Sequence, residues 1–164
     1  MNKNTIYVVV AVIVVILIVG VAAYMFLGNN QGGTTTPTPT PAPTTIVGAS
    51  TVQFNVNDSG VVYTFSAKNF NTSSVVLRVD MDLGASGNYS YILDAGQEKS
   101  WVSTNGGSFA ASTFSSDWTT YGTLFNGYAD KIVAHGSTSD FTEGTATIYC
   151  IAANPTLADS LFTP

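Results

Sequence analysis

Hydrophobic residues are most concentrated near the N-terminus. Residues 6–27 carry no charged side chain, and 12 of these 22 residues are Val or Ile. As an α-helix with a rise of ~1.5 Å per residue, the segment would be about 33 Å long, which is enough to cross a bilayer. Lys3 is the only charged side chain before Asp58, so the positive-inside rule assigns residues 1–5 to the cytoplasm and the rest of the chain to the outside. The sequence therefore predicts a single-pass transmembrane helix in the cell membrane, over residues 6–27.

A cleaved secretory signal is the alternative interpretation of this segment. Val21 and Ala23 are small residues of the kind that precede a cleavage site. Signal cores usually contain about 7–15 residues, so the longer run favours an uncleaved anchor. Both interpretations place the remaining chain outside the cytoplasm.

Residues 28–45 have the composition of a linker. Thr34–Thr45 contains seven Thr and four Pro residues, none of which can build a hydrophobic core. Alternating Thr and Pro favour polyproline II, with a rise of about 3.1 Å per residue, and this composition is typical of O-glycosylated stalks. We expect a semi-rigid stalk, with a disordered tether as the alternative.

Beyond the linker, hydrophobic and polar positions alternate, which indicates half-buried β-strands. The alternating segments are 52–56, 61–67, 75–82, 89–93 and 145–152, and a further short strand is expected at Trp101. Turn residues such as Asp58-Ser59-Gly60 separate them. Because one face of each strand must be covered, residues 46–164 are predicted to form an extracytoplasmic antiparallel β-sandwich.

One segment changes from the period of a strand to that of a helix. Large apolar residues follow one another at intervals of three or four: Phe114, Trp118, Tyr121, Phe125, Tyr128 and Ile132. This spacing predicts a helical insertion over about residues 116–133. We expect the stripe of Trp118, Tyr121, Phe125 and Tyr128 to pack across a sheet face, since apolar stripes on helices normally cover cores. The alternative is that the stripe is exposed, in which case it would be a binding surface for sugars or for a partner.

Residues 61–101 resemble a family of small surface domains. The pattern is a strand (62–68), a polar turn (69–74), a strand that ends in acidic residues (75–82), the segment Leu93-Asp94-Ala95-Gly96, and Ser100-Trp101. It is similar to the cell-adhesion-related (CARDB) and FxLYD domains that follow membrane anchors in archaeal and bacterial surface proteins. The resemblance implies an immunoglobulin-like β-sandwich used for adhesion or spacing.

Charge and catalytic side chains are both scarce in this chain. Charged residues make up 9% of the 164 residues, where soluble domains average about 25%. The net charge of −5 argues against nucleic acid as a partner.

The chain has one imidazole and one thiol. We expect the imidazole, His135, to lie in an exposed loop. We expect the thiol, Cys150, to be a small buried residue, with an intermolecular disulfide as the alternative. We therefore predict no catalytic residue, no cofactor and no enzyme activity; a hydrolase with paired carboxylates is the less favoured alternative.

The sequence also contains candidate calcium ligands and candidate N-glycosylation sites. Asp80, Asp82 and Asp94 are candidate calcium ligands because hard cations prefer oxygen, although such carboxylates are more often the solvated face of a strand. Asn57, Asn71 and Asn88 each begin an Asn-x-Ser sequence, the acceptor for N-glycosylation, at a predicted turn.

These patterns predict a membrane-anchored surface glycoprotein that displays a binding or adhesion domain. Surface glycans or other envelope proteins are the expected partners, besides the membrane itself. The alternative is a structural subunit of a surface filament or cell envelope, in which the apolar helix packs against copies of itself as a homo-oligomer.

Overall fold

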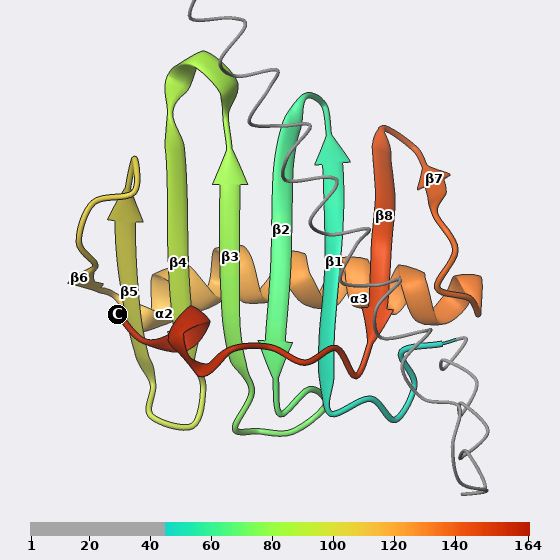
Figure 1. The fold of residues 1–164 in the computed structure, drawn as a ribbon, viewed down its shortest axis with the longest axis horizontal. Coiled ribbons are helices and arrows are strands. Elements are labelled where there is room, and N and C mark those ends of the chain that lie inside the picture. The colour runs from blue at the N-terminus through green and yellow to red at the C-terminus, as the bar shows by residue number, and fades with distance from the viewer. Residues whose placement is uncertain (1–44) are drawn as a thin grey trace, which may run out of the picture. The chain divides into compact units, whose positions relative to one another are not determined.

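The computed structural model describes residues 45–164, whose strands form one antiparallel sheet (Figure 1). The strands are β1 (Thr51–Asp58), β2 (Val61–Lys68), β3 (Val76–Asp82), β4 (Asn88–Asp94), β5 (Lys99–Thr104), β6 (Ala110–Ser112), β7 (Phe141–Glu143) and β8 (Ala146–Ala153). Their order across the sheet is β6-β5-β4-β3-β2-β1-β8-β7. The first six strands thus run as a meander, and β8 returns to pair with the other side of β1.

Short turns set the register of the meander. Between β1 and β2, Ser59 and Gly60 both have positive φ angles, 53° and 88°. Two-residue turns of this kind match the right-handed twist of the strands that they join. The amide oxygen of Asn57 accepts a hydrogen bond from the Gly60 N–H at 3.3 Å and closes the turn. The predicted turn at 58–60 is confirmed. Between β3 and β4 the chain forms a short 3-10 helix, η1 (Gly84–Ser86).

The hydrophobic core lies on one face of the sheet. Alternate residues of the central strands and of β8 have no exposed surface: Val52, Phe54, Val56, Phe65, Leu77, Val79 and Ile148. Each projects from the same side, because successive side chains of a strand point to opposite faces. The strand pattern read from the sequence is therefore confirmed for these elements.

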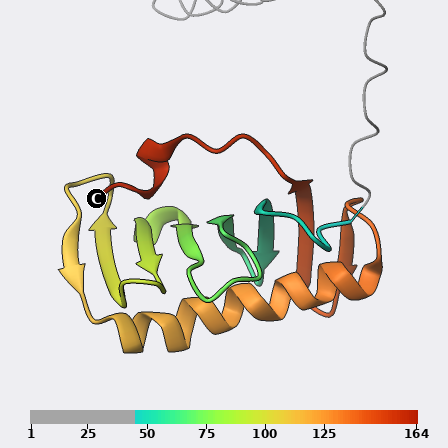
Figure 2. The same cartoon turned by 90° about the horizontal axis from the view of Figure 1, so that it is seen from below.

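A helix crosses this apolar face from one edge of the sheet to the other (Figure 2). It consists of α2 (Phe114–Asp117), the π-helical turn η2 (Trp118–Gly122) and α3 (Thr123–His135). It ends where Gly136 adopts the left-handed conformation, with φ of 71°, as helix C-termini commonly do. The predicted helical segment is confirmed, and it extends two residues further at each end.

The predicted sandwich needs a correction. The domain is mainly β and antiparallel with one helix, as predicted, but all eight described strands belong to one sheet. The helix covers the face where a second sheet was expected, because its apolar stripe supplies the surface that the strands must bury. The architecture in residues 45–164 is a sheet layer and a helix layer.

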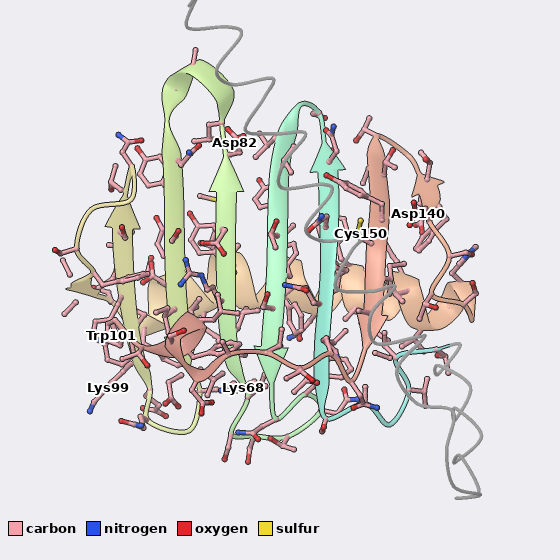
Figure 3. The ribbon with its side chains drawn as sticks, viewed as in Figure 1. Lys68, Asp82, Lys99, Trp101, Asp140 and Cys150 are labelled. Atoms are coloured by element: carbon pink, nitrogen blue, oxygen red, sulfur yellow. The ribbon has the colours of Figure 1, made fainter. Side chains whose placement is uncertain are left out.

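The C-terminal tail crosses the opposite face of the sheet (Figure 2). Residues 154–164, which include the 3-10 helix η3 (Asp159–Phe162), form this tail. The Thr51 hydroxyl donates to the Pro155 carbonyl at 2.9 Å, and Arg78 Nη1 donates to the Leu161 carbonyl at 2.9 Å. Lys68, which is labelled in Figure 3, pairs with Asp159, and the Asp159 side chain is almost fully exposed. Polar contacts with β1, β2 and β3 therefore hold the tail in place.

Asp159→Asn is expected to loosen the tail. The hydrogen bond and charge of Lys68 lower the pKa of Asp159, so the contact is complete above the ordinary carboxyl range and is lost as the pH falls through the lowered pKa. Carboxypeptidase should release the last residues faster from the variant than from the wild type at pH 7. The control Thr156→Ala, also exposed, should leave the rate unchanged. Equal rates for the wild type and Asp159→Asn would mean that the ion pair does not restrain the tail.

The predicted membrane anchor lies outside the described residues, as do residues 1–5 and all of the predicted linker except Thr45. Within residues 45–164, no helix combines the length and hydrophobicity needed to span a membrane.

Candidate functional site

The sheet face opposite the helix presents polar side chains in a regular array. Cross-strand pairing places one outward residue from each of six neighbouring strands side by side: Tyr149, Asn55, Thr64, Asp80, Ser90 and Ser103. We call these residues the central row. Neighbouring strands lie about 4.8 Å apart, so the row runs across the sheet, perpendicular to the strands. It joins hydroxyl, amide and carboxylate groups from segments that are nearly 100 positions apart in the sequence.

A second polar row lies closer to the β3–β4 turn. Its members are Thr147, Asn57, Val62, Asp82 and Asn88, and we call them the upper row. On the other side of the central row, Arg78 binds the tail, and Ile92 is completely buried. The central and upper rows are thus the part of this face that lies beyond the tail contacts. Figure 3 shows Asp82 at the far end of β3 from Lys68 and the tail.

An ion pair fixes the middle of the central row. Arg78 Nη2 lies 2.8 Å from Asp80 Oδ1, and its Nε lies 2.8 Å from Oδ2, which is the fork geometry of a strong guanidinium–carboxylate pair. The Ser90 hydroxyl donates to the same Oδ1 at 2.5 Å. The Asp80 carboxylate is therefore held by two neighbouring strands, and the positive charge of Arg78 offsets its negative charge.

Three other groups of the central row are open to a ligand. Within residues 45–164, the Asn55 amide, the Thr64 hydroxyl and the Tyr149 hydroxyl form no hydrogen bond. Each of these side chains is half-buried between its neighbours on the sheet. Partial burial restricts the rotamers of these side chains, so they lose less conformational entropy on binding than fully exposed side chains would. The row is therefore preorganised for hydrogen bonding.

A shallow depression lies where the two rows cross β2, β3 and β4. It has a volume of about 400 Å³, and its lining includes Val62, Thr64, Asp80, Asp82 and Ser90. Small-molecule sites usually measure about 300–1,000 Å³. This hollow gives the otherwise flat face a place for part of a ligand.

The structure separates the three candidate calcium ligands. Asp80 and Asp82 project from the same face of β3, but Asp94 lies at the opposite end of β4, where it accepts a hydrogen bond from the Gln97 N–H at 2.9 Å. Asp80 is already paired with Arg78, and Asp82 accepts from the Gly84 N–H at 2.8 Å. Among residues 45–164, no three His, Cys, Asp or Glu side chains gather into a possible metal site.

The aromatic stripe of the helix packs on the sheet and is not a binding platform. Phe125 is 1% exposed, and Tyr128 is 5% exposed. Trp118 and Tyr121 are half-buried against the same core, where Tyr121 lies 4.2 Å from Tyr91 between ring centroids. Burial, together with Tyr91, raises the pKa of Tyr121. The packing interpretation is confirmed, and the alternative of an exposed sugar-stacking stripe is wrong, because the sheet offers these rings a dry surface.

All three glycosylation candidates are exposed, but their environments differ. Asn57 lies in the upper row and closes the β1–β2 turn. Asn88 also lies in the upper row and, with its amide nitrogen facing its neighbours, donates to Asp82 Oδ1 at 3.0 Å and to the Gly87 carbonyl at 3.1 Å. Asn71 lies in the β2–β3 turn, away from both rows, with φ of 63°. Modification at each position stays a prediction.

His135 lies apart from the central row, whereas Cys150 directly follows Tyr149, a member of that row. His135 is exposed at the end of α3, where its Nε2 lies 3.3 Å from Ser139 Oγ and its ring stacks on Phe141.

The expectation of a buried Cys150 is wrong, since the thiol is exposed. The register shifts between Gln53 and Asn55, and Cys150 takes a φ of 53° in the resulting bulge. Its N–H donates to Asp140 Oδ1 at 3.0 Å, and Figure 3 shows the two residues on β8 and on the segment before β7.

A hydrogen-bonded cluster at the edge of the upper row ties the helix to the sheet. The Tyr128 hydroxyl donates to Asp58 Oδ2 at 2.9 Å, and the Thr145 hydroxyl donates to Oδ1 at 2.8 Å. Hydrogen bonds from Thr145 and Tyr128 lower the pKa of Asp58. Burial, followed by the bond to Asp58, raises the pKa of Tyr128 to about 12. The cluster is therefore intact between the ordinary carboxyl range and the ordinary tyrosine range.

Tyr128→Phe is expected to lower the free energy of unfolding by about 1 kcal/mol at pH 7, because it removes one hydrogen bond and keeps the ring. The raised pKa of Tyr128 stabilises the fold below the unfolded value of about 10, and this contribution is lost as the pH rises through about 12. The difference between wild type and variant in denaturant unfolding should therefore shrink from pH 9 to pH 12. A constant difference over that range would contradict the assigned bond.

Sequence reasoning missed the central row. Its members were visible as the outward residues of alternating strands, and Asp80 was singled out, but the row exists only because of the register between strands. The signal that was available is the two-residue turn after Asp58, which fixes the pairing of Asn55 with Thr64.

The chain matches no protein-family model, no curated protein and no solved structure. The resemblance of residues 61–101 to CARDB and FxLYD domains therefore stays a prediction.

Proposed function

We propose that this chain is a single-pass surface protein that displays residues 46–164 outside the cell on a Thr/Pro stalk, for binding or adhesion. The observation that supports the proposal best is the order of three parts along the chain. An uncharged apolar segment (residues 6–27) is followed by a Thr/Pro-rich segment, and then by a folded domain whose polar sheet face is open. A cytoplasmic N-terminus follows from Lys3 and the positive-inside rule.

Binding is favoured over catalysis by the distribution of reactive groups. Within residues 45–164, His135 contacts Ser139 and Phe141 and hydrogen-bonds no carboxylate. Asp80 is neutralised by Arg78, and the exposed thiol of Cys150 lies on β8. Acid–base catalysis needs such groups within hydrogen-bonding reach of one another. The open face instead offers fixed hydrogen-bonding groups, which is the property of a binding surface.

The edges of the sheet disfavour assembly of residues 45–164 by strand pairing. The outermost strands, β6 and β7, contain three residues each. Short edge strands limit edge-to-edge pairing with another chain. The proposal does not depend on an immunoglobulin-like relationship, because it rests on the topology of the chain and on the open face.

Protease shaving of intact cells, followed by intact-mass analysis, tests the display. We expect a released fragment that begins within residues 28–45 and extends through the domain, while residues 6–27 stay with the membrane. Mass in excess of the sequence would report glycans on the linker or on the Asn-x-Ser sites. Complete protection would contradict the proposal, provided that a known surface protein is cleaved and a cytoplasmic protein is not.

A further inference from the structure

We propose that the central row binds a neutral oligosaccharide, which lies across the strands from β8 to β4. This inference rests on the proposed function, because it names the class of ligand for the displayed face. It is carried by the register of the sheet, which places Tyr149, Asn55, Thr64, Asp80 and Ser90 in one line.

The groups of the row match the chemistry of sugar hydroxyls. A sugar hydroxyl donates one hydrogen bond and accepts others. The hydroxyls of Tyr149 and Thr64 and the amide of Asn55 can also both donate and accept. None of these three groups is hydrogen-bonded within residues 45–164. Asp80 Oδ2 accepts only from Arg78 among these residues, so it has capacity for a further donor.

The charges on this face favour a neutral ligand. Asp80 and Asp82 are the carboxylates of the two rows, and Arg78, the cation beside them, is already paired with Asp80. Because Arg78 offsets the charge of Asp80, a sulfated, phosphorylated or uronic-acid polymer would meet the uncompensated carboxylate of Asp82, with no unpaired cation in either row. Such an interface would place like charges together, which opposes binding.

The same face is a poor match for a second copy of this chain or for another protein. The centre of a protein–protein interface is rich in apolar and aromatic residues. In the two rows, Val62 and Tyr149 are the residues of that kind. A face-to-face dimer would bury Asp80, Asp82 and the amides of Asn55 and Asn57 against the same polar face of a second copy.

The shape of the face suits an extended chain of sugar rings. The row from Tyr149 to Ser90 spans four inter-strand gaps, about 19 Å at ~4.8 Å each. The depression of about 400 Å³ at β2, β3 and β4 can receive one ring. At the β8 end of the row, Tyr149 combines an apolar ring with a polar tip, which suits the mixed character of a sugar.

The test uses the full chain in nanodiscs prepared without sugar-based detergents. The probes are hexasaccharides of β1,4-linked glucose, α1,4-linked glucose, β1,4-linked mannose and β1,4-linked N-acetylglucosamine, with a heparin-type hexasaccharide as the acidic probe. Binding is measured by titration calorimetry, with each probe raised to about 5 mM to include weak complexes. The alkylation rate of the exposed Cys150, next to Tyr149, gives a second readout of occupancy.

A matched pair of variants assigns the binding to the row. The double variant Asn55→Ala, Thr64→Ala removes two of the open groups. The control Asn126→Ala, Thr123→Ala makes the same chemical changes at exposed positions of α3, on the other side of the molecule. Both variants must retain the wild-type Trp fluorescence and unfolding midpoint. We expect at least one neutral hexasaccharide to bind, with affinity reduced about tenfold or more in the row variant and unchanged in the control.

Three results would overturn the inference: no neutral hexasaccharide binds, the row variant binds as tightly as the wild type, or the heparin-type probe binds more tightly than the neutral probes. Each is distinct from failure of the proposed function. If protease shaving releases the domain but no sugar binds, the proposed surface display is supported and only the proposed class of ligand is contradicted. If shaving does not release the domain, the proposed surface display is contradicted, whatever the result of the sugar titrations.

Discussion

Replacing Phe125 with alanine is expected to lower the free energy of unfolding of residues 45–164 by about 3–5 kcal/mol. Phe125 is 1% exposed, and its ring lies between helix and sheet. It stacks on Phe54 at 5.7 Å and meets Phe65 and Phe70 at 5.9 Å between centroids. Alanine would leave a cavity among three rings from β1, β2 and the turn after it, and those rings cannot all move to fill the space.

Urea unfolding followed by the fluorescence of Trp101 and Trp118 measures this loss, since both tryptophans lie in the described domain. Val133→Ala on the same helix is the matched control, because Val133 is 42% exposed. Its effect should stay within about 0.5 kcal/mol. If Phe125→Ala cost no more than Val133→Ala, the helix would not form the second layer of the core.

Gly122→Ala is expected to destabilise the domain by about 1–3 kcal/mol, although alanine is normally the better helix residue. Gly122 is buried at the end of η2, and a Cβ there would lie 2.6 Å from Cδ2 of the Trp118 indole. The indole, which stacks on Phe114 at 5.6 Å between ring centroids, would have to shift from its packed position. The same urea unfolding experiment measures the change.

Gly127 provides the matched control within the same helix. A Cβ at Gly127 meets nothing within 4 Å, so Gly127→Ala should stabilise the domain by about 0.5–1 kcal/mol through helix propensity alone. Combining Gly122→Ala with Trp118→Leu should recover part of the loss by removing the clash. Stabilisation by Gly122→Ala alone would show that the indole does not lie over the glycine in solution.

Most secondary structure could be predicted because its signals are local. The alternation through Val75–Asp82 and the helical spacing from Phe114 to Ile132 depend on neighbouring residues only, and both appear in the structure as β3 and as the helix. β6 and β7 contain three residues each, too few for alternation to be detected. They exist because longer partners, β5 and β8, pair with them.

Features that depend on contacts distant in sequence could not be predicted. The number of sheets depends on which layer covers the apolar face, and alternation is the same under a helix as under a second sheet. Cys150 was misplaced because the bulge in β8 shifts the alternation, and no residue that typically adopts positive φ marks it in the sequence. The central row has the same origin: each outward side chain was visible, but their alignment requires the register of five strand pairs.

Cysteine accessibility in intact cells tests most directly the central claim, which is that the polar sheet face is open and lies outside the cell. In a Cys150→Ser background, Thr64→Cys probes the central row, and Val56→Cys probes the buried face, where Val56 has no exposed surface. A membrane-impermeant maleimide should label the Thr64→Cys variant in intact cells and the Val56→Cys variant only after unfolding. Labelling of Thr64→Cys only after the cells are permeabilised would contradict the outward orientation, and labelling only after unfolding would contradict the open face.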